Sequence, residues 1–144
     1  MFVRRQHRLS EENLAEYLSR CGLISPGERL DVEALGDGNI NWVRRFRTAS
    51  GTRVVKQARS ALERFPQYQA PTERIVCEAR YFETTAPFDL EGICPRILFF
   101  DPEERVLVLE DLGDAERLDS ALARGADVSR SAAAVAAFLG RVHR

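Results

Sequence analysis

Lys56 is the single lysine of this 144-residue chain, in which all other Lys/Arg positions hold arginine. It closes the run Arg53-Val54-Val55-Lys56, which predicts a strand with Lys56 and Val54 on one face and Val55 on the other. A lysine on a partly buried strand needs a counter-charge, either a carboxylate or a phosphate. Its compact charge differs from the planar fork of arginine, although a GC-rich genome would also explain why lysine is scarce. The neighbouring Arg59 is expected at the surface.

A carboxylate partner is available on a helix that is predicted to begin near Thr72. Apolar residues recur there at helical spacing and mark one buried stripe: Ile75, Ala79, Phe82 and Ala86. At about 100° per residue, Glu78 falls on the shoulder of that stripe and Glu73 on the solvent side. Glu78 is therefore the glutamate that can reach Lys56, although a surface position is the usual fate of either glutamate.

A glycine-rich turn precedes the strand expected to pair with the Lys56 strand. It reads Gly36-Asp37-Gly38-Asn39-Ile40-Asn41, which is part of a GxGxxG pattern. In a dinucleotide-binding fold such a turn leads into a helix, but here the strand-like run 41–48 follows. Kinase-type folds use a strand, a glycine loop and a strand to place backbone amides over nucleotide phosphates. The alternative is an ordinary hairpin turn with Gly and Asn at positive φ.

The elements that must position these residues predict an α+β fold. A first helix is expected from Ser10, its N-cap, to Cys21. Strands are expected at 30–35, 41–48, 52–58, 96–100 and 105–110. Further helices are expected over 114–124 and after the N-caps Thr72 and Ser129. The short turn at 50–51 makes 41–48 and 52–58 an antiparallel hairpin. We divide the chain into a helical extension (1–29), a strand-rich unit (30–112) and a final helical segment (113–144).

Length, charge and cysteine usage restrict the class of protein. A chain of 144 residues fits one domain, and a formal net charge of −1 argues against a nucleic-acid partner. No apolar run has the roughly 18 residues of a membrane helix, and no secretory signal is visible at the N-terminus. The cysteines, Cys21, Cys77 and Cys94, form no CxxC pattern, so a reducing cytoplasm fits better than a disulfide framework or a zinc site.

A family resemblance is carried by four segments: Gly36-Asp37-Gly38-Asn39-Ile40-Asn41-Trp42-Val43, Val55-Lys56-Gln57-Ala58, Glu73-Arg74 with Glu78-Ala79, and Glu110-Asp111-Leu112. With them the sequence resembles the N-terminal lobe of methylthioribose kinase-like proteins, in the aminoglycoside phosphotransferase and choline kinase superfamily. The DGNxN element followed by VKQA is fairly specific for the methylthioribose kinase branch. The resemblance covers residues 30–144 and implies a protein-kinase-like N-lobe, a five-stranded antiparallel sheet plus helix C, followed by the first helices of a C-lobe.

The resemblance also implies ATP as the bound nucleotide and assigns roles to individual residues. The phosphate-covering loop would be Gly36, Asp37, Gly38, Asn39, Ile40 and Asn41. Lys56 would contact the α- and β-phosphates, and Glu78 would hold Lys56. The backbone of Glu110, Asp111 and Leu112 would form the hinge that hydrogen-bonds adenine, with Ile40 and Val54 as walls for the base. The reaction implied for the family transfers the γ-phosphoryl group of MgATP to a hydroxyl of a sugar-like metabolite.

The same resemblance places the catalytic loop and the metal ligands beyond Arg144. We therefore expect no catalytic or metal-binding residue in this chain, Mg²⁺ only in a full-length parent, and no phosphotransfer by this chain alone. The last helix reaches Arg144 without a stop signal, and its apolar face is expected to promote homo-oligomers: Val135, Phe138, Leu139 and Val142. Two alternatives stay open, a non-catalytic module that binds nucleotide or a partner protein, and an α+β domain that has lost binding.

Overall fold

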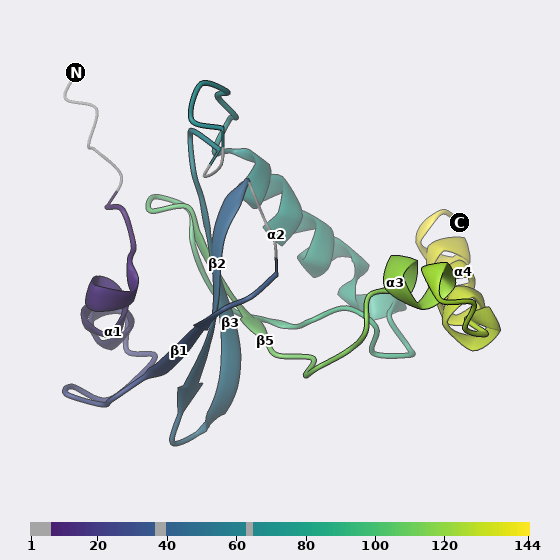
Figure 1. The fold of residues 1–144 in the computed structure, drawn as a ribbon, viewed down its shortest axis with the longest axis horizontal. Helices are drawn as coiled ribbons and strands as arrows, with labels where there is room; N and C mark the ends of the chain where they lie inside the picture. The colour runs from purple at the N-terminus through teal and green to yellow at the C-terminus, as the bar shows by residue number, and fades with distance from the viewer. Residues whose placement is uncertain (1–6, 37–39, 63–64) are drawn as a thin grey trace.

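A computed structural model describes residues 7–36, 40–62 and 65–144. In this part of the chain the strands form a five-stranded antiparallel sheet in the order β1-β2-β3-β5-β4 (Figure 1). The strands are β1 (Asp31–Ala34), β2 (Asn41–Thr48), β3 (Gly51–Ala58), β4 (Ile97–Asp101) and β5 (Val106–Glu110). The helices are α1 (Glu11–Arg20), α2 (Arg74–Thr85), α3 (Leu118–Ala123) and α4 (Ser129–Val142), with a 3₁₀ turn, η1 (Ala86–Phe88). The α+β class and the antiparallel sheet expected from the sequence are confirmed.

Strand β3 lies at the centre of the sheet and carries residues to both of its faces. It pairs with β2 through a tight hairpin, in which Thr48 lies opposite Gly51. Gly51 has a φ of 123°, a conformation that favours glycine. On its other side β3 pairs with β5, where Lys56 lies opposite Leu107. Because side chains alternate along a strand, Lys56 and its successor Gln57 point to opposite faces.

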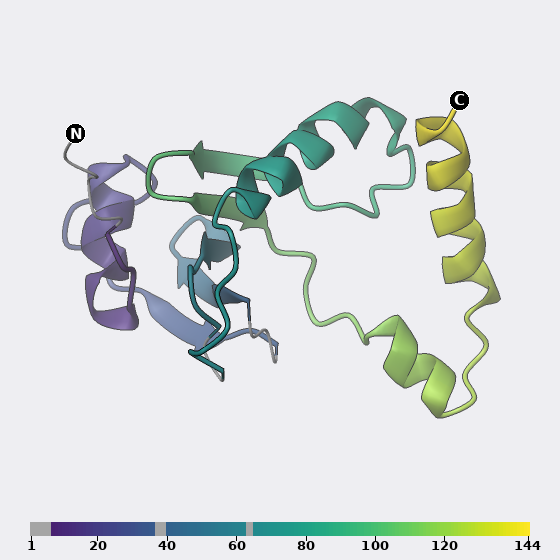
Figure 2. The ribbon, with the colours of Figure 1, turned by 90° about the horizontal axis from the view of Figure 1, so that it is seen from above.

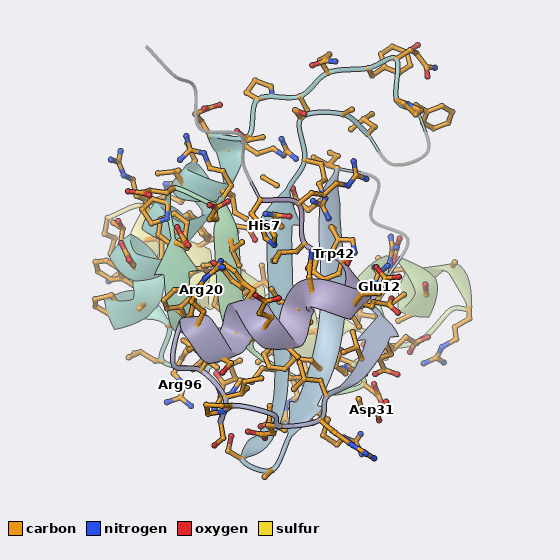
Figure 3. All side chains as sticks on the ribbon, turned by 90° about the vertical axis from the view of Figure 1, so that its left-hand side faces the viewer. His7, Glu12, Arg20, Asp31, Trp42 and Arg96 are labelled. Carbon is orange, nitrogen blue, oxygen red and sulfur yellow. The ribbon has the colours of Figure 1, made fainter. Side chains whose placement is uncertain are left out.

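Helix α1 covers the face of the sheet opposite α2 (Figures 1 and 3). The Ser10 N–H donates to Asn13 Oδ1 at 2.8 Å, which helps the helix to begin where the sequence predicts. One hydrophobic cluster joins the helix to the sheet: Leu9, Leu14, Tyr17, Leu18, Ile24, Trp42, Phe46, Val55, Val106 and Val108. Each fully buried leucine stabilises the fold by roughly 2 kcal/mol. The N-terminal helix therefore shares a hydrophobic core with the sheet.

A buried polar network ties the segment before α1 to β3. Gln57, fully buried, accepts a hydrogen bond from Leu9 N–H at 3.0 Å and donates to His7 O at 2.7 Å and Glu104 O at 3.0 Å. Arg59 donates to Gln57 Oε1 at 2.6 Å and to Leu9 O at 2.5 Å. Arg59 is only 6% exposed, so its expected surface position is wrong. The N-terminal segment supplies the acceptor that makes burial of this guanidinium tolerable.

Helix α2 packs on the inner face, which is the face that carries Lys56. It begins at Arg74 rather than near Thr72. Ile75 and Ala79 are buried as the stripe predicts, in a cluster completed by Val54, Ala58, Leu107 and Leu109. The expected stripe ends early, because Ala86 is exposed and starts the turn η1. The helix is thereby held against the same face of β3 as Lys56.

The chain after β5 runs away from the sheet before it forms α3 and α4 (Figure 2). Helix α3 begins at Leu118, four residues later than expected, because Asp111 and Asp114 in the preceding segment are held by Arg45 of β2. Helix α4 has Ser129 as its first residue rather than its N-cap. It contacts η1, where Arg141 donates to Phe88 O at 2.7 Å. Among the described helices, none has the length and apolar character to cross a membrane.

Candidate functional site

Lys56 and Glu78 form an ion pair on the inner face of the sheet. Lys56 Nζ donates to Glu78 Oε1, and the two side chains are 21% and 26% exposed. The inward direction expected for Glu78 is therefore confirmed. β2 and β5 flank the lysine with Val43 and Leu107 at its register positions. These apolar neighbours partly desolvate the Lys56 ammonium. Because a partly desolvated ammonium needs a counter-charge, Lys56 depends on the Glu78 carboxylate.

Glu73, on the same helix, does not join this pair. Its side chain is 66% exposed and forms an ion pair with Arg105, with 3.2 Å between Glu73 Oε1 and Arg105 NH2. Hydrogen bonds from its own backbone N–H and from Arg105 lower the pKa of Glu73. The solvent-side position expected for Glu73 is confirmed. Of Glu73 and Glu78, it is Glu78 that contacts Lys56.

The glycine-rich turn is described at its two ends, and the expected residues Asp37, Gly38 and Asn39 lie outside the described residues. Gly36 has a φ of 71°, in the left-handed region that glycine adopts without strain. At the other end, Ile40 is 48% exposed and Asn41 begins β2. Arg74 of α2 donates to Ile40 O at 2.5 Å and to Asn41 Oδ1 at 2.8 Å. The exit of the loop is thus held by the helix that carries Glu78.

The predicted hinge follows directly from β5. Glu110 binds Arg96 through both carboxylate oxygens, at 3.1 Å to Nε and 3.0 Å to NH2, and these bonds lower the pKa of Glu110. The Glu110 N–H donates to Arg96 O at 2.9 Å, so this backbone group is used within the sheet. Leu112 is 51% exposed. Of the hinge residues, Glu110 is bound by Arg96, which precedes β4, and Leu112 has an exposed apolar side chain.

Arg45 fixes the middle of the hinge, and the sequence pattern did not single it out. Its guanidinium binds Asp111 at 3.0 Å, Asp114 at 2.7 Å and Glu33 of β1 at 3.0 Å, and donates to Gly113 O at 3.1 Å. Asp114 and Glu33 lead the carboxylates that raise the pKa of Arg45. An arginine on the inner face of β2 facing an acidic segment is the signal that would have found it. Through Arg45, β2, the strand that follows the glycine-rich turn, also holds the hinge.

A cavity of about 670 Å³ opens between the end of α2, the segment before β4 and the hinge. Its walls include Phe82, Ala86 and Ile97, with Glu110 and Leu112 on the hinge side. The volume lies in the range of small-molecule sites, and mixed apolar and polar walls are typical of them. Within residues 7–36, 40–62 and 65–144, no group of three or more His, Cys, Asp or Glu side chains is placed to hold a metal ion.

Comparison with known proteins finds relatives of this chain. No protein-family model matches the chain. The methylthioribose kinase of Pectobacterium atrosepticum is 33% identical, over 90% of this chain and 33% of the relative, and that of Pectobacterium carotovorum subsp. carotovorum is 34% identical, over 88% and 32%. The methylthioribose kinase of Yersinia enterocolitica is 31% identical, over 95% of this chain and 35% of the relative. The chain is related to the methylthioribose kinases. It spans about a third of the length of these relatives.

In this methylthioribose kinase-like chain, the inner face of the sheet offers an anchored positive charge. The Lys56 ammonium is held at one side by Glu78 and keeps 21% of its side chain exposed. A lysine that is oriented by a carboxylate and still reaches solvent can bind an anionic oxygen as a point charge. Val54, 8% exposed, lies on the same face two residues away. The arrangement therefore suits an anionic ligand.

Proposed function

We propose that the chain is the ATP-binding lobe of a small-molecule kinase, which transfers the γ-phosphoryl group of ATP to a hydroxyl of a sugar-like metabolite, methylthioribose or a close analogue. The observation that carries the proposal is the Lys56–Glu78 ion pair on the inner face of the sheet. The relation to methylthioribose kinases supports the acceptor class. In such a transfer the protein acts mainly by positioning and by neutralising charge.

The roles of the residues follow from their places around the pair. Lys56 would bind the α- and β-phosphates while Glu78 orients it, and the loop from Gly36 to Asn41 would cover those phosphates with its backbone amides. Val54 supplies a buried apolar wall at 8% exposure and Ile40 an exposed one at 48%. Because the Glu110 N–H is used by Arg96 O, we assign the adenine contact to the backbone of Asp111 and Leu112.

The magnesium ion that accompanies ATP would be bound by its phosphates and by ligands that we assign to none of the described residues. MgATP supplies the transferable phosphoryl group, and this chain would supply the nucleotide contacts. We assign the catalytic base to no residue of this chain, so the purified 144-residue chain should not phosphorylate methylthioribose.

The test is a nucleotide titration of the chain that is monitored by two-dimensional NMR, which detects millimolar affinities. ATP and ADP should shift the amide signals of β3 and of the hinge. The Lys56→Arg variant should bind about tenfold more weakly or worse, which is about 1.4 kcal/mol, because the guanidinium fork does not reproduce the point contact between two phosphates. Arg80→Lys, an exposed position on α2, is the matched control and should bind like the wild type. Equal affinity of Lys56→Arg and the wild type would refute the phosphate site.

A second candidate function, a non-catalytic module that binds nucleotide or a partner protein, is favoured by exposed apolar side chains in the hinge and after it. Leu112 is 51% exposed, Leu122 56% and Leu139 41%. The two candidates differ in what the gene encodes after Arg144. A reading frame that continues into an HGD-type catalytic loop favours the kinase, and a stop codon favours the binding module.

A further inference from the structure

Arg74, the first residue of α2, joins segments that are distant in the sequence. Its guanidinium donates to Ile40 O at 2.5 Å, to Asn41 Oδ1 at 2.8 Å and to Arg59 O at 3.0 Å. It also donates to Ala70 O at 3.3 Å and to Pro71 O. One side chain therefore holds the exit of the glycine-rich loop, the residue after β3 and the approach to α2.

The two sets of contacts suit an arginine. NH2 donates to Ile40 O, Asn41 Oδ1 and Arg59 O, and NH1 donates to Ala70 O and Pro71 O. A lysine ammonium donates from one atom and could serve only one of the two sets. Burial lowers the pKa of Arg74, but an arginine remains charged at neutral pH. Hydrogen bonds from a charged donor are the stronger ones, so the loop exit is firmly held.

The same helix also holds Lys56. Glu78 follows Arg74 by four residues, a spacing that places two side chains on one side of a helix. Arg74 thus binds the loop exit and Glu78 binds Lys56 from adjacent turns of α2. A displacement of α2 along or away from the sheet would break both contacts, because both are made by side chains of α2.

We infer that Arg74 is a positioning residue, which locks the exit of the glycine-rich loop to α2 so that the loop and the Lys56 ammonium are placed by one rigid element. Nucleotide affinity then depends on α2 through two linked contacts rather than through the Lys56–Glu78 pair alone. That the loop covers nucleotide phosphates rests on the proposed function. The attachment of the loop exit to α2 does not, because it is a property of the chain without nucleotide.

The attachment is tested by amide hydrogen exchange of the full 144-residue chain in the absence of nucleotide. In Arg74→Gln, the amides at positions 41–43 should exchange about tenfold faster or more, because local opening no longer breaks hydrogen bonds to a charged group. The amides at 46–48, at the far end of β2, should keep their rates, which separates local release from general loss of stability.

Two further variants complete this test. Arg74→Lys keeps the charge but donates from one atom, so it should hold one set of acceptors and release positions 41–43 less than Arg74→Gln does. Arg80→Gln removes an exposed arginine from the same helix and should change neither set of amides. Unchanged exchange at 41–43 in Arg74→Gln would overturn the inference.

The linkage to Lys56 is tested by a double-mutant cycle on nucleotide affinity with Arg74→Gln and Glu78→Gln. If both contacts act through α2, the double variant should lose less affinity than the product of the two single losses. Losses that multiply would mean that Arg74 and Glu78 act independently and would overturn the linkage. If the wild type binds no nucleotide, the proposed function fails, and the exchange comparison still decides whether Arg74 holds the loop exit.

Discussion

Gln57 should be one of the side chains on which the stability of this fold most depends. It is fully buried on the outer face of β3, next to the candidate phosphate-binding Lys56 on the inner face. The substitution Gln57→Leu keeps the size of the side chain and removes both polar groups. It leaves the Leu9 N–H and one Arg59 donor without the acceptor that they share at 3.0 Å and 2.6 Å.

The size of the effect follows from these two donors. A buried donor that loses its partner costs about 1–3 kcal/mol, and a buried leucine returns part of that as apolar contact, roughly 1–2 kcal/mol. The carbonyl oxygens of His7 and Glu104 lie near the surface and can be hydrated. We therefore expect the free energy of unfolding to fall by about 3 kcal/mol, a large share of the 5–15 kcal/mol of a typical domain.

Urea denaturation followed by the fluorescence of Trp42, the single tryptophan, measures this change. With a slope of about 2 kcal/mol per molar urea, the midpoint should fall by about 1.5 M. Gln67→Leu, at an exposed turn position, is the matched control and should change the free energy by less than about 0.5 kcal/mol. A fall of less than about 1 kcal/mol in Gln57→Leu would refute the reasoning, because it would show that the N-terminal segment does not depend on this glutamine.

Three further outcomes are expected. Burial and a hydrogen bond to Asp101 raise the pKa of Tyr17. Because an unfolded tyrosine ionises near pH 10, the free energy of unfolding should fall above pH 10 by up to about 1.4 kcal/mol per pH unit. Tyr17→Phe should flatten that slope in denaturation measured from pH 9 to 11. Arg96 lowers the pKa of Glu110, so the contact is intact at neutral pH and lost in acid, and Arg96→Gln should raise the Glu110 pKa in an NMR titration. Phe138, expected on the apolar face of α4, is buried at 3% exposure, but Val135 and Leu139 are each 41% exposed. These two side chains should cause concentration-dependent association in sedimentation, and a monomer at high concentration would contradict this.

Much of the fold was accessible from the sequence because local signals agreed with one another. The strand-like runs 41–48 and 52–58, with a short turn between them, predict an antiparallel hairpin, and β2 and β3 form it. Helical spacing likewise placed Ile75 and Ala79 inside and turned Glu78 toward the sheet and Glu73 away from it. These are consequences of the helix and strand periods, so they need no knowledge of the partner element.

The errors came where a distant residue decides a local outcome. The segment 111–117 was expected to be helical from 114, but Arg45 of β2 holds Asp111 and Asp114 and keeps it extended. Arg59 was expected at the surface, but Leu9 O and Gln57 satisfy its guanidinium inside. In both cases an ionic or hydrogen-bonding partner far along the chain outweighs the local preference.

The sequence by itself determined the strand segments, the hairpin of β2 and β3, the two faces of β3 and the residue on α2 that meets Lys56. Only the tertiary structure decided that Arg74 holds the exit of the glycine-rich loop and that Arg45 holds the hinge. It also decided that the N-terminal segment is hydrogen-bonded to Gln57 on the outer face of β3. The physical reason is the same for all three. A long polar side chain can satisfy its donors in many directions, and which acceptors it finds is set by elements that only folding brings together.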